Sequence, residues 1–239
     1  MIQNAKDVSN EFGRCRIKIE IFSDRLVFSH NGDPFEMDHL QSLVDQYSSK
    51  TEENTDDVET TGKYGTGFIA TYILSRKVRI KGIIEMKDSE DAMGMVDEKD
   101  EPQKEARAVE ENEYQRFEIF LDREYKQRDT ELVRKLMMTE HVLMADLMRG
   151  QAQPKWRRKE DDLDTQFIYE QLDEAAQAMI QEAIPTLKEL FPYVLLFNPR
   201  LYELEVVNNT KADIKNFKIR RGEAIDYEGL SIFTAKVSG

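Results

Sequence analysis

Residues 15–34 read CRIKIEIFSDRLVFSHNGDP, and this stretch decides the fold. Ile17, Ile19 and Ile21 alternate with charged residues, which is the period-two pattern of a half-buried β-strand. A Ser-Asp turn then separates this stretch from Arg-Leu-Val-Phe-Ser at residues 25–29. The sequence therefore predicts a β-hairpin, followed by a loop at Asn31–Pro34 whose residues tolerate turn geometry.

Regular patterns continue on both sides of the hairpin. Apolar residues at helical spacing predict helices at about 1–11, 37–47, 68–74, 130–148 and 172–190. Pro192 is expected to end the last helix, and leucines and methionines to form the apolar face of the helix at 130–148. Further strands are predicted at about 78–86, 114–121, 201–207, 214–219 and 230–235. The acidic segments 48–61 and 87–113 lack periodicity and are predicted to be flexible.

These elements indicate an α+β fold, with helices on one face of a mixed, mostly antiparallel sheet. The last three strands are expected to open a second unit. The first predicted helix has no capping residue before it, so we expect the natural start of the protein to lie upstream of Met1.

Composition limits the classes of function. The chain has 239 residues, of which 40% are hydrophobic, and a net charge of −13. This charge argues against general binding to nucleic acid or to anionic membranes, since phosphate contacts need a cationic surface. The single cysteine, Cys15, excludes an internal disulfide framework and favours a cytoplasmic location. We find no secretory signal, no membrane-spanning run and no zinc-ligand spacing among His30, His39, His141 and Cys15.

The first chemistry-bearing motif is Gln3-Asn-Ala-Lys-Asp7, on the opening helix. Asn4 and Asp7 are three residues apart and share a helical face. An amide oxygen beside a carboxylate suits Mg²⁺, which prefers oxygen ligands. A plain polar helix face is the alternative interpretation, and for this motif alone it is the favoured one.

Two glycine motifs follow. His30-Asn-Gly-Asp-Pro-Phe35 lies directly after a predicted strand, where a glycine lets backbone approach a ligand, although an ordinary turn has the same sequence. Gly62-Lys-Tyr-Gly-Thr-Gly-Phe68 leads into a helix, whose exposed N–H groups and dipole favour an anion. Its spacing fits neither the P-loop nor the dinucleotide fingerprint. Lys50 and Lys63 are close enough in sequence to reach a phosphate, although exposed lysines usually do nothing specific.

In this order the motifs resemble the GHKL superfamily of gyrase, heat-shock chaperone, histidine kinase and MutL. Asn4 and Asp7 look like its N-box, His30-Asn31-Gly32 like its Asp-x-Gly-x-Gly box, and Gly62–Gly67 like its second glycine box. Asp164-Thr-Gln-Phe167 is similar to the later Gly-Thr-x-Phe element, whose threonine contacts the nucleotide. The stretch from Ser49 to Phe68 looks most like sacsin and related bacterial proteins.

The resemblance implies a Bergerat-type ATP-binding domain over residues 1–170, with an acidic insertion at 87–113. Residues 171–239 would be a linking helix and strands leading into a following domain. It implies ATP and Mg²⁺ as cofactors, with Asn4 on the metal. The nucleotide-binding residues it implies are Asn4, Asp7, His30, Asn31, Gly32, Lys50, Gly62, Lys63, Gly65, Thr66, Gly67, Phe68 and Thr165.

Three departures from the family pattern affect these expectations. The family's general-base glutamate would lie one residue before Met1, so no catalytic residue is assigned within the chain, and Gln3 cannot replace it. The family aspartate that accepts a hydrogen bond from the adenine amino group corresponds to His30. A neutral imidazole nitrogen could accept that bond, and Asp33 or a water could serve instead. Asp164 stands where the third element has glycine.

The leading hypothesis is an ATP-operated conformational module, of chaperone or defence type, acting on a protein client or effector. The alternatives are a histidine kinase core and a non-catalytic nucleotide sensor. Against the kinase, no dimerisation helix bearing a histidine precedes the domain. Homodimerisation is left open.

Overall fold

The computed structural model describes residues 13–36, 40, 43, 70–85, 114–123, 129–150, 158–210, 215–223, 225–227, 230–232 and 234–239. Several predicted features lie outside these residues: the helix at 1–11, most of the helix at 37–47, the glycine motif at 62–67, and the acidic segments 48–61 and 87–113.

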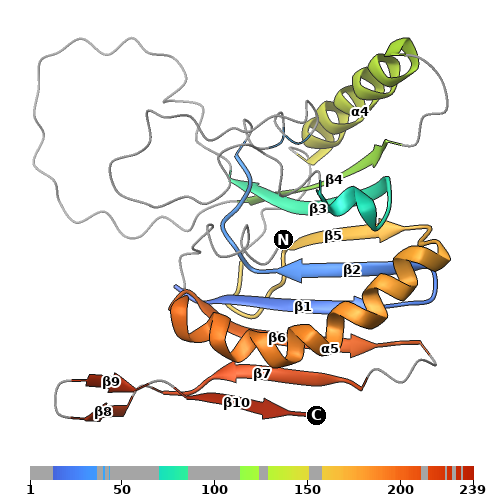
Figure 1. Ribbon diagram of the computed structural model, residues 1–239. Helices are drawn as coiled ribbons and strands as arrows, with labels where there is room; N and C mark the ends of the chain where they lie inside the picture. Colours follow the sequence, from blue (N-terminus) through green and yellow to red (C-terminus); the bar gives the residue numbers. More distant parts are fainter. Residues whose placement is uncertain are drawn as a thin grey trace, which may run out of the picture.

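A mixed eight-stranded sheet forms the centre of the molecule, in the order β10-β7-β6-β1-β2-β5-β3-β4 (Figure 1). Its strands are β1 (Cys15–Ile21), β2 (Arg25–His30), β3 (Lys77–Glu85), β4 (Tyr114–Asp122), β5 (Thr165–Glu170), β6 (Leu201–Asn208), β7 (Phe217–Arg221) and β10 (Ala235–Ser238). Strands β8 (Ile225–Tyr227) and β9 (Leu230–Ile232) pair only with each other. Within the large sheet β1 and β6 are parallel, and the other neighbouring strands are antiparallel. The α+β class and the mixed, mostly antiparallel sheet are therefore confirmed.

The predicted hairpin is formed by β1 and β2. Ile17 pairs with His30, and Ile21 pairs with Leu26. The three isoleucines of β1 are all buried, whereas the charged residues between them are partly exposed. The alternation in the sequence thus becomes the two faces of the sheet, one apolar and one charged.

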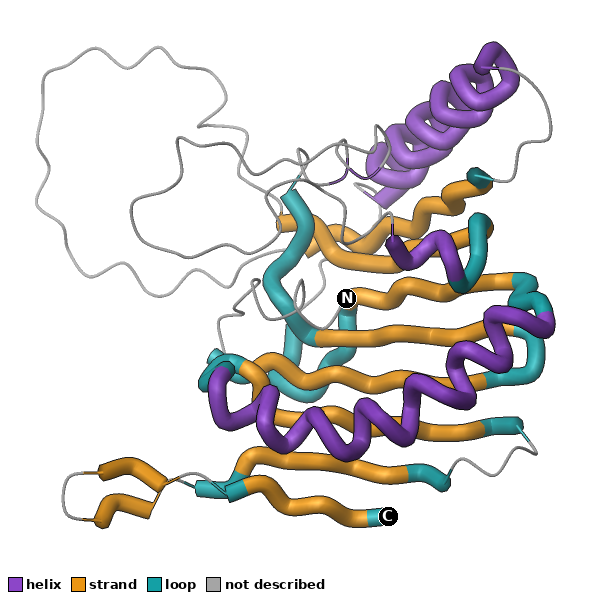
Figure 2. Tube along the Cα trace, in the orientation of Figure 1, coloured by secondary structure: helices purple, strands orange, loops and turns teal. Residues whose placement is uncertain are grey.

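Two long helices and one short helix are described: α4 (Asp129–Gly150), α5 (Glu174–Phe197) and the 3-10 helix η2 (Ala70–Ile73). Helix α5 lies across one face of the sheet, over β1, β6 and β7 (Figures 1 and 2). It buries Ile180, Ile184 and Phe191 in the core, and Asp173 caps its start by accepting a hydrogen bond from the Ala176 amide at 2.8 Å. Helix α4 packs along β4 through the buried Leu143 and Leu147.

The helices differ from the sequence predictions in two respects. Helix α5 does not end at Pro192 but continues to Phe197, with Pro185 also inside it. Proline removes one backbone hydrogen bond, and here the burial of Phe191 and Leu195 on either side of Pro192 offsets that loss. On α4 Leu143 and Leu147 are buried, whereas three methionines expected on the apolar face are exposed: Met137, Met138 and Met144.

The strands after residue 200 continue the same sheet, although the sequence analysis places them at the start of a second unit. Strand β6 pairs in parallel with β1 along its whole length, and β7 and β10 follow outward. Strand β1 carries buried side chains and needs a partner on each edge, since an open edge would expose unpaired backbone groups. Strand β6 supplies the second partner.

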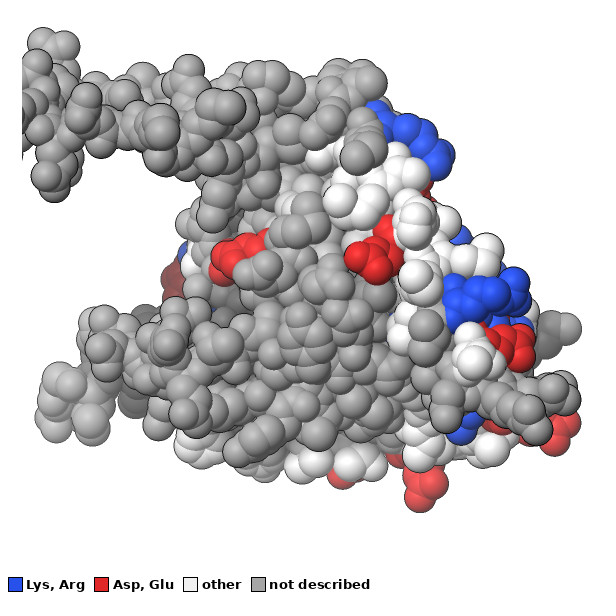
Figure 3. Space-filling view, turned by 90° about the horizontal axis from the view of Figure 1, so that it is seen from above, with Lys and Arg blue, Asp and Glu red and all other residues white. Residues whose placement is uncertain are grey.

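Charged side chains on the strands away from the core pair with one another. Glu203, 3% exposed, accepts hydrogen bonds from Arg16 at 3.0 Å and from Arg220 at 2.6 Å. Arg79 bridges β3 to β5 by donating to Glu170 at 2.7 Å. In the view from above, the described acidic and basic side chains lie interspersed rather than in one patch of a single sign (Figure 3). None of the described helices combines the length and apolar character needed to cross a bilayer.

Candidate functional site

Two of the predicted motifs meet in the middle of the sheet. His30 is the last residue of β2, Thr165 is the first residue of β5, and the two are direct partners in the antiparallel pairing. Residues that face each other in this way project to the same side of a sheet. Of the other predicted site residues, Asn31 and Gly32 are described, and the rest lie outside the described residues: Asn4, Asp7, Lys50, Gly62, Lys63, Gly65, Thr66, Gly67 and Phe68.

The His30 ring is held in a fixed orientation. It is 7% exposed, stacks on Phe167 with ring centroids 6.2 Å apart, and meets the edge of Phe28 at 5.9 Å. Its Nδ1 accepts a hydrogen bond from the Gly32 amide at 3.0 Å. Burial, together with the positive charge of Arg158, lowers the pKa of His30 from 6.5 to about 3.

These contacts determine which nitrogen of His30 carries the proton. The ring is neutral at physiological pH, and its Nδ1 lone pair is already used by Gly32. The proton therefore resides on Nε2, so this nitrogen is a donor. Of the three acceptors considered for an adenine amino group, a free imidazole nitrogen, Asp33 and a water, the first does not fit this geometry, because Nε2 of His30 is a donor.

Thr165 supplies a second polar group beside His30. Its side chain is 1% exposed, and its Oγ1 has no hydrogen-bond partner among the described residues. Ser29 Oγ is also buried without a hydrogen-bond partner among the described residues, but strand alternation directs it to the opposite face of the sheet. Buried hydroxyls without partners are rare in proteins, and such a group is a candidate contact for a water or a ligand.

Asn31 fixes the start of the glycine turn. Its side chain is fully buried, accepts a hydrogen bond from the Arg16 amide at 2.6 Å, and donates to the carbonyls of Arg14 and Glu160 at 3.1 and 3.0 Å. The side-chain amide thus joins β1 to the loop before β5. Its role in the described geometry is structural, and contact with a nucleotide stays a prediction.

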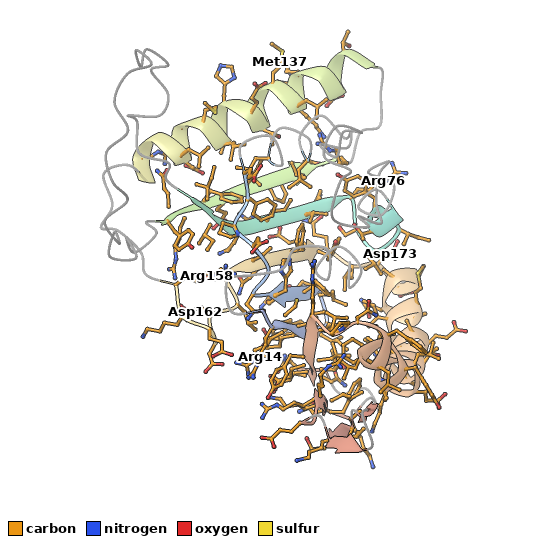
Figure 4. The ribbon with its side chains drawn as sticks, turned by 90° about the vertical axis from the view of Figure 1, so that its left-hand side faces the viewer. Arg14, Arg76, Met137, Arg158, Asp162 and Asp173 are labelled. Carbon is orange, nitrogen blue, oxygen red and sulfur yellow. The ribbon has the colours of Figure 1, made fainter. Side chains whose placement is uncertain are left out.

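Arg158 binds the backbone of the turn at Asn31 and Gly32. Its Nε donates to Asp164 at 2.7 Å, and the two side chains are 1% and 2% exposed. Its Nη2 donates to the Asn31 carbonyl at 2.8 Å and also to the Gly32 carbonyl. Burial raises the pKa of Asp164, and the ion pair with Arg158 opposes this rise. In Figure 4, Arg158 lies away from Asp173, on the other side of the strands.

Cys15 lies near this cluster but is not a reactive thiol. It is 2% exposed, and burial raises its pKa to about 12, with Arg158 opposing and Asp33 adding to the shift. A thiol with this pKa stays protonated at neutral pH, whereas nucleophilic cysteines need an accessible thiolate. The burial of Cys15 suits a packing role in the core.

A separate cavity of about 540 Å³ lies where the start of β5 meets β3, β4 and the end of α4. Its charged lining residues are Lys81, Arg116, Glu118, Asp146, Arg149, Asp162 and Asp164. Carboxylates neutralise two of the cations, because Lys81 pairs with Glu118 at 3.1 Å and Arg149 with Asp146 at 3.2 Å. This mixed lining is a weaker anion site than a cluster of unpaired cations would be.

Sequence reasoning missed Arg158 and the strand β5. Arg158 belongs to a short basic run, Trp156-Arg-Arg-Lys159, in an otherwise acidic chain, and this contrast is the one signal available. In the part of the chain that the structure describes, no three His, Cys, Asp or Glu side chains group together in a way that could hold a metal. A scan against protein-family models found no match to this chain, and a search of curated proteins found none either.

Proposed function

We propose that this chain binds ATP together with Mg²⁺ and uses the bound nucleotide to change the conformation of the protein. The observation that carries the proposal is the pairing of His30 with Thr165. Two motifs that the family resemblance assigns to one nucleotide lie side by side, and they come from distant parts of the chain. The buried Thr165 hydroxyl without a partner supports a ligand at this point.

The remaining roles are those that the family resemblance implies. The Gly62–Gly67 turn would hold the phosphates through its amide groups, and Asn4 would hold the metal. The segment from about residue 36 to 61 would close over the nucleotide and transmit the presence of the terminal phosphate. Bound ATP supplies the phosphate charge to which such a segment responds. Chaperone-like and defence-type functions both fit this description.

A non-catalytic nucleotide sensor is the second candidate, and the ion pair at Asp164 favours it. Asp164 is the carboxylate adjacent to Thr165, but it is committed to Arg158. A general base must be able to take a proton, and a carboxylate held in this way is a poor one. If the protein hydrolyses ATP, the general base must therefore be a residue other than Asp164.

A thermal-shift experiment tests the proposal. A ligand at about one hundred times its dissociation constant stabilises the folded state by roughly 2.7 kcal/mol, which is easily visible as a higher melting temperature. We expect Mg·ATP to raise the melting temperature of the wild-type chain. Gly65→Val should abolish the shift, and Asn4→Ala should remove its magnesium-dependent part.

Thr165→Val tests the described part of the site, and Ser29→Ala is its matched control. Both changes remove a buried hydroxyl without a partner, but only Thr165 lies on the His30 side of the sheet. Thr165→Val should reduce the shift with Mg·ATP, whereas Ser29→Ala should leave it unchanged. A folded wild-type protein that shows no shift with millimolar Mg·ATP would rule the proposal out.

A further inference from the structure

The last two turns of helix α5 are apolar on every side. Residues 190–197 read LFPYVLLF, and none of these side chains is charged. Phe191 and Leu195 are buried in the core, as are Ile180 and Ile184 earlier in the helix. A surface helix usually carries one apolar stripe, whereas a helix that is apolar all round is enclosed on all sides. The end of α5 therefore presents a second apolar surface, on the side away from the sheet.

This second surface, which we call the α5 outer face, consists of Leu190, Tyr193, Leu196 and Phe197. The four residues are 54%, 61%, 44% and 82% exposed, and Phe197 is the most exposed of the large hydrophobic residues that the structure describes. Leu190, Tyr193 and Phe197 follow one another at spacings of three and four residues, so they form one continuous stripe along the helix. In Figure 1, α5 lies in front of the sheet, and no other described element lies over it.

The area of the α5 outer face is close to what a dimer interface needs. A large apolar side chain has roughly 200 Å² of accessible surface, so at these exposed fractions the four residues leave about 500 Å² open to solvent. A contiguous apolar patch of this size marks an interaction site. Two such faces packed together would bury about 1,000 Å², which is the lower limit for a specific interface between proteins.

We propose that this chain forms a homodimer in which the α5 outer faces of two copies pack together across a twofold axis. In a symmetric dimer the same patch meets itself, so the patch must be complementary to itself. An uncharged stripe meets this condition, because neither copy leaves a charge unpaired in the contact. Tyr193 is the middle residue of the stripe and lies nearest the axis, facing Tyr193 of the partner subunit whichever way the two helices run. The dimer is independent of the proposed nucleotide binding.

The charge of the chain predicts how this dimer responds to salt. A net charge of −13 on each copy opposes their association, so the apolar contact must overcome this repulsion. Salt screens the repulsion, since the Debye length falls from about 10 Å at 0.1 M to about 3 Å at 1 M. The dimer should therefore become tighter as the salt concentration rises, whereas a complex held together by opposite charges would weaken.

Sedimentation velocity of the full chain tests the proposal. At micromolar concentrations we expect the mass of two chains, with a dissociation constant that is lower in about 1 M than in about 0.1 M sodium chloride. Tyr193→Glu and Tyr193→Arg each place two like charges at the twofold axis, so each should weaken dimerisation by at least about a hundredfold. An equal mixture of these two variants should form heterodimers, because opposite charges then meet at the axis.

Met138→Glu and Met138→Arg are the matched controls. Met138 is 58% exposed, close to the value for Tyr193, but it lies on α4. Both control variants should dimerise like the wild type, alone or mixed. Recovery of dimers in the mixture of Tyr193 variants also shows that these variants are folded, since a misfolded chain would not regain a partner.

Tyr193→Cys provides a second measurement that adds no charge. Mild oxidation should join two copies through this residue, visible as a double-length chain on a non-reducing gel, whereas Met138→Cys should stay a single chain. The native Cys15 is 2% exposed and should not react.

Three results would overturn the proposal. The first is a wild-type chain that stays monomeric at both salt concentrations. The second is a dimer that Tyr193→Glu and Tyr193→Arg leave intact, because its interface would then lie elsewhere on the chain. The third is a Tyr193→Cys variant that does not cross-link under conditions in which the wild type is dimeric. None of these results bears on nucleotide binding, which the thermal-shift experiment tests separately.

Discussion

Arg158 joins separate pieces of the candidate site. It holds the carbonyls of Asn31 and Gly32 and pairs with Asp164, one residue before Thr165. It therefore links the end of β2 to the start of β5, the two strand ends that bring His30 and Thr165 together. A buried ion pair contributes little net stability when it is intact, but breaking it leaves one charge without a partner.

Arg158→Met should destabilise the protein by about 3–5 kcal/mol, because Asp164 is then buried without its partner. Denaturant unfolding measures the loss. The double variant Arg158→Met with Asp164→Leu removes both charges and should recover a large part of the stability. If the double variant loses the sum of the two single losses, the pair does not act as a unit.

The pKa of His30 predicts a pH dependence of stability. The folded pKa of about 3 lies below the unfolded value of 6.5, so the unfolded chain binds a proton that the folded chain does not. The stability contributed by His30 is therefore complete above pH 6.5 and is lost as the pH falls toward 3. Between pH 7 and pH 5 the loss should be about 2 kcal/mol.

Denaturant unfolding of the wild-type chain and of His30→Phe at the two pH values measures this contribution. The variant lacks the titrating group, so its stability should change less over this interval, whereas His141→Phe should follow the wild type. Equal pH dependence of wild type and His30→Phe would show that His30 is not held neutral by its surroundings.

Among the strands, β3 and β4 are joined where Gly82 faces Phe117. A Cβ placed on Gly82 would lie 2.7 Å from Phe117 Cζ and 2.9 Å from Phe35 Cδ2. The rings of Phe35 and Phe117 pack edge to face with centroids 5.2 Å apart, and the Phe35 amide donates to the Ile83 carbonyl at 2.8 Å. Gly82 thus provides the space through which the segment after the glycine turn reaches β3.

Gly82→Ala should cost about 1–3 kcal/mol, because the added methyl group overpacks this contact between two aromatic rings. The double variant Gly82→Ala with Phe117→Leu has room for the methyl group and should lose less than the sum of the two single changes. Thermal unfolding of the four proteins measures the coupling. Strictly additive losses would show that the ring does not obstruct the methyl group.

The hairpin was predictable, whereas its neighbour β5 was not. Ile17, Ile19 and Ile21 alternate over a long enough stretch to specify both faces of β1. Strand β5 has six residues, and its burial shows no alternation, because Gln166, Phe167 and Ile168 are all partly buried. Helix α5 was predicted too short, since a proline usually ends a helix and its tolerance here depends on packing contacts that no local pattern contains.

The candidate site was predictable only in its parts. The His30-Asn-Gly motif and the Thr165 element were both singled out by their residues, but their pairing is a long-range contact between β2 and β5. The proton position on His30 depends on the Gly32 amide and on burial, and neither can be derived from residue spacing. Arg158 was missed for the same reason, because two of its acceptors, the carbonyls of Asn31 and Gly32, belong to a loop that is distant in the sequence.

In the molecule as a whole, one sheet carries the His30–Thr165 pair, and the loops next to these strand ends carry Asn31, Gly32 and Arg158. Strands β2 and β5 are the middle of that sheet, with three strands beyond β1 on one side and two beyond β5 on the other. Central strands have the most neighbours and the least freedom to shift. A polar pair in that position is held rigidly, which suits a binding site.

A structure of the full chain with Mg²⁺ and a non-hydrolysable ATP analogue tests the central claim most directly. We expect the adenine ring against the His30–Thr165 pair and the phosphates at the Gly62–Gly67 turn. A base more than one water away from His30, or a nucleotide bound instead in the cavity lined by Lys81, Arg116 and Arg149, would contradict it.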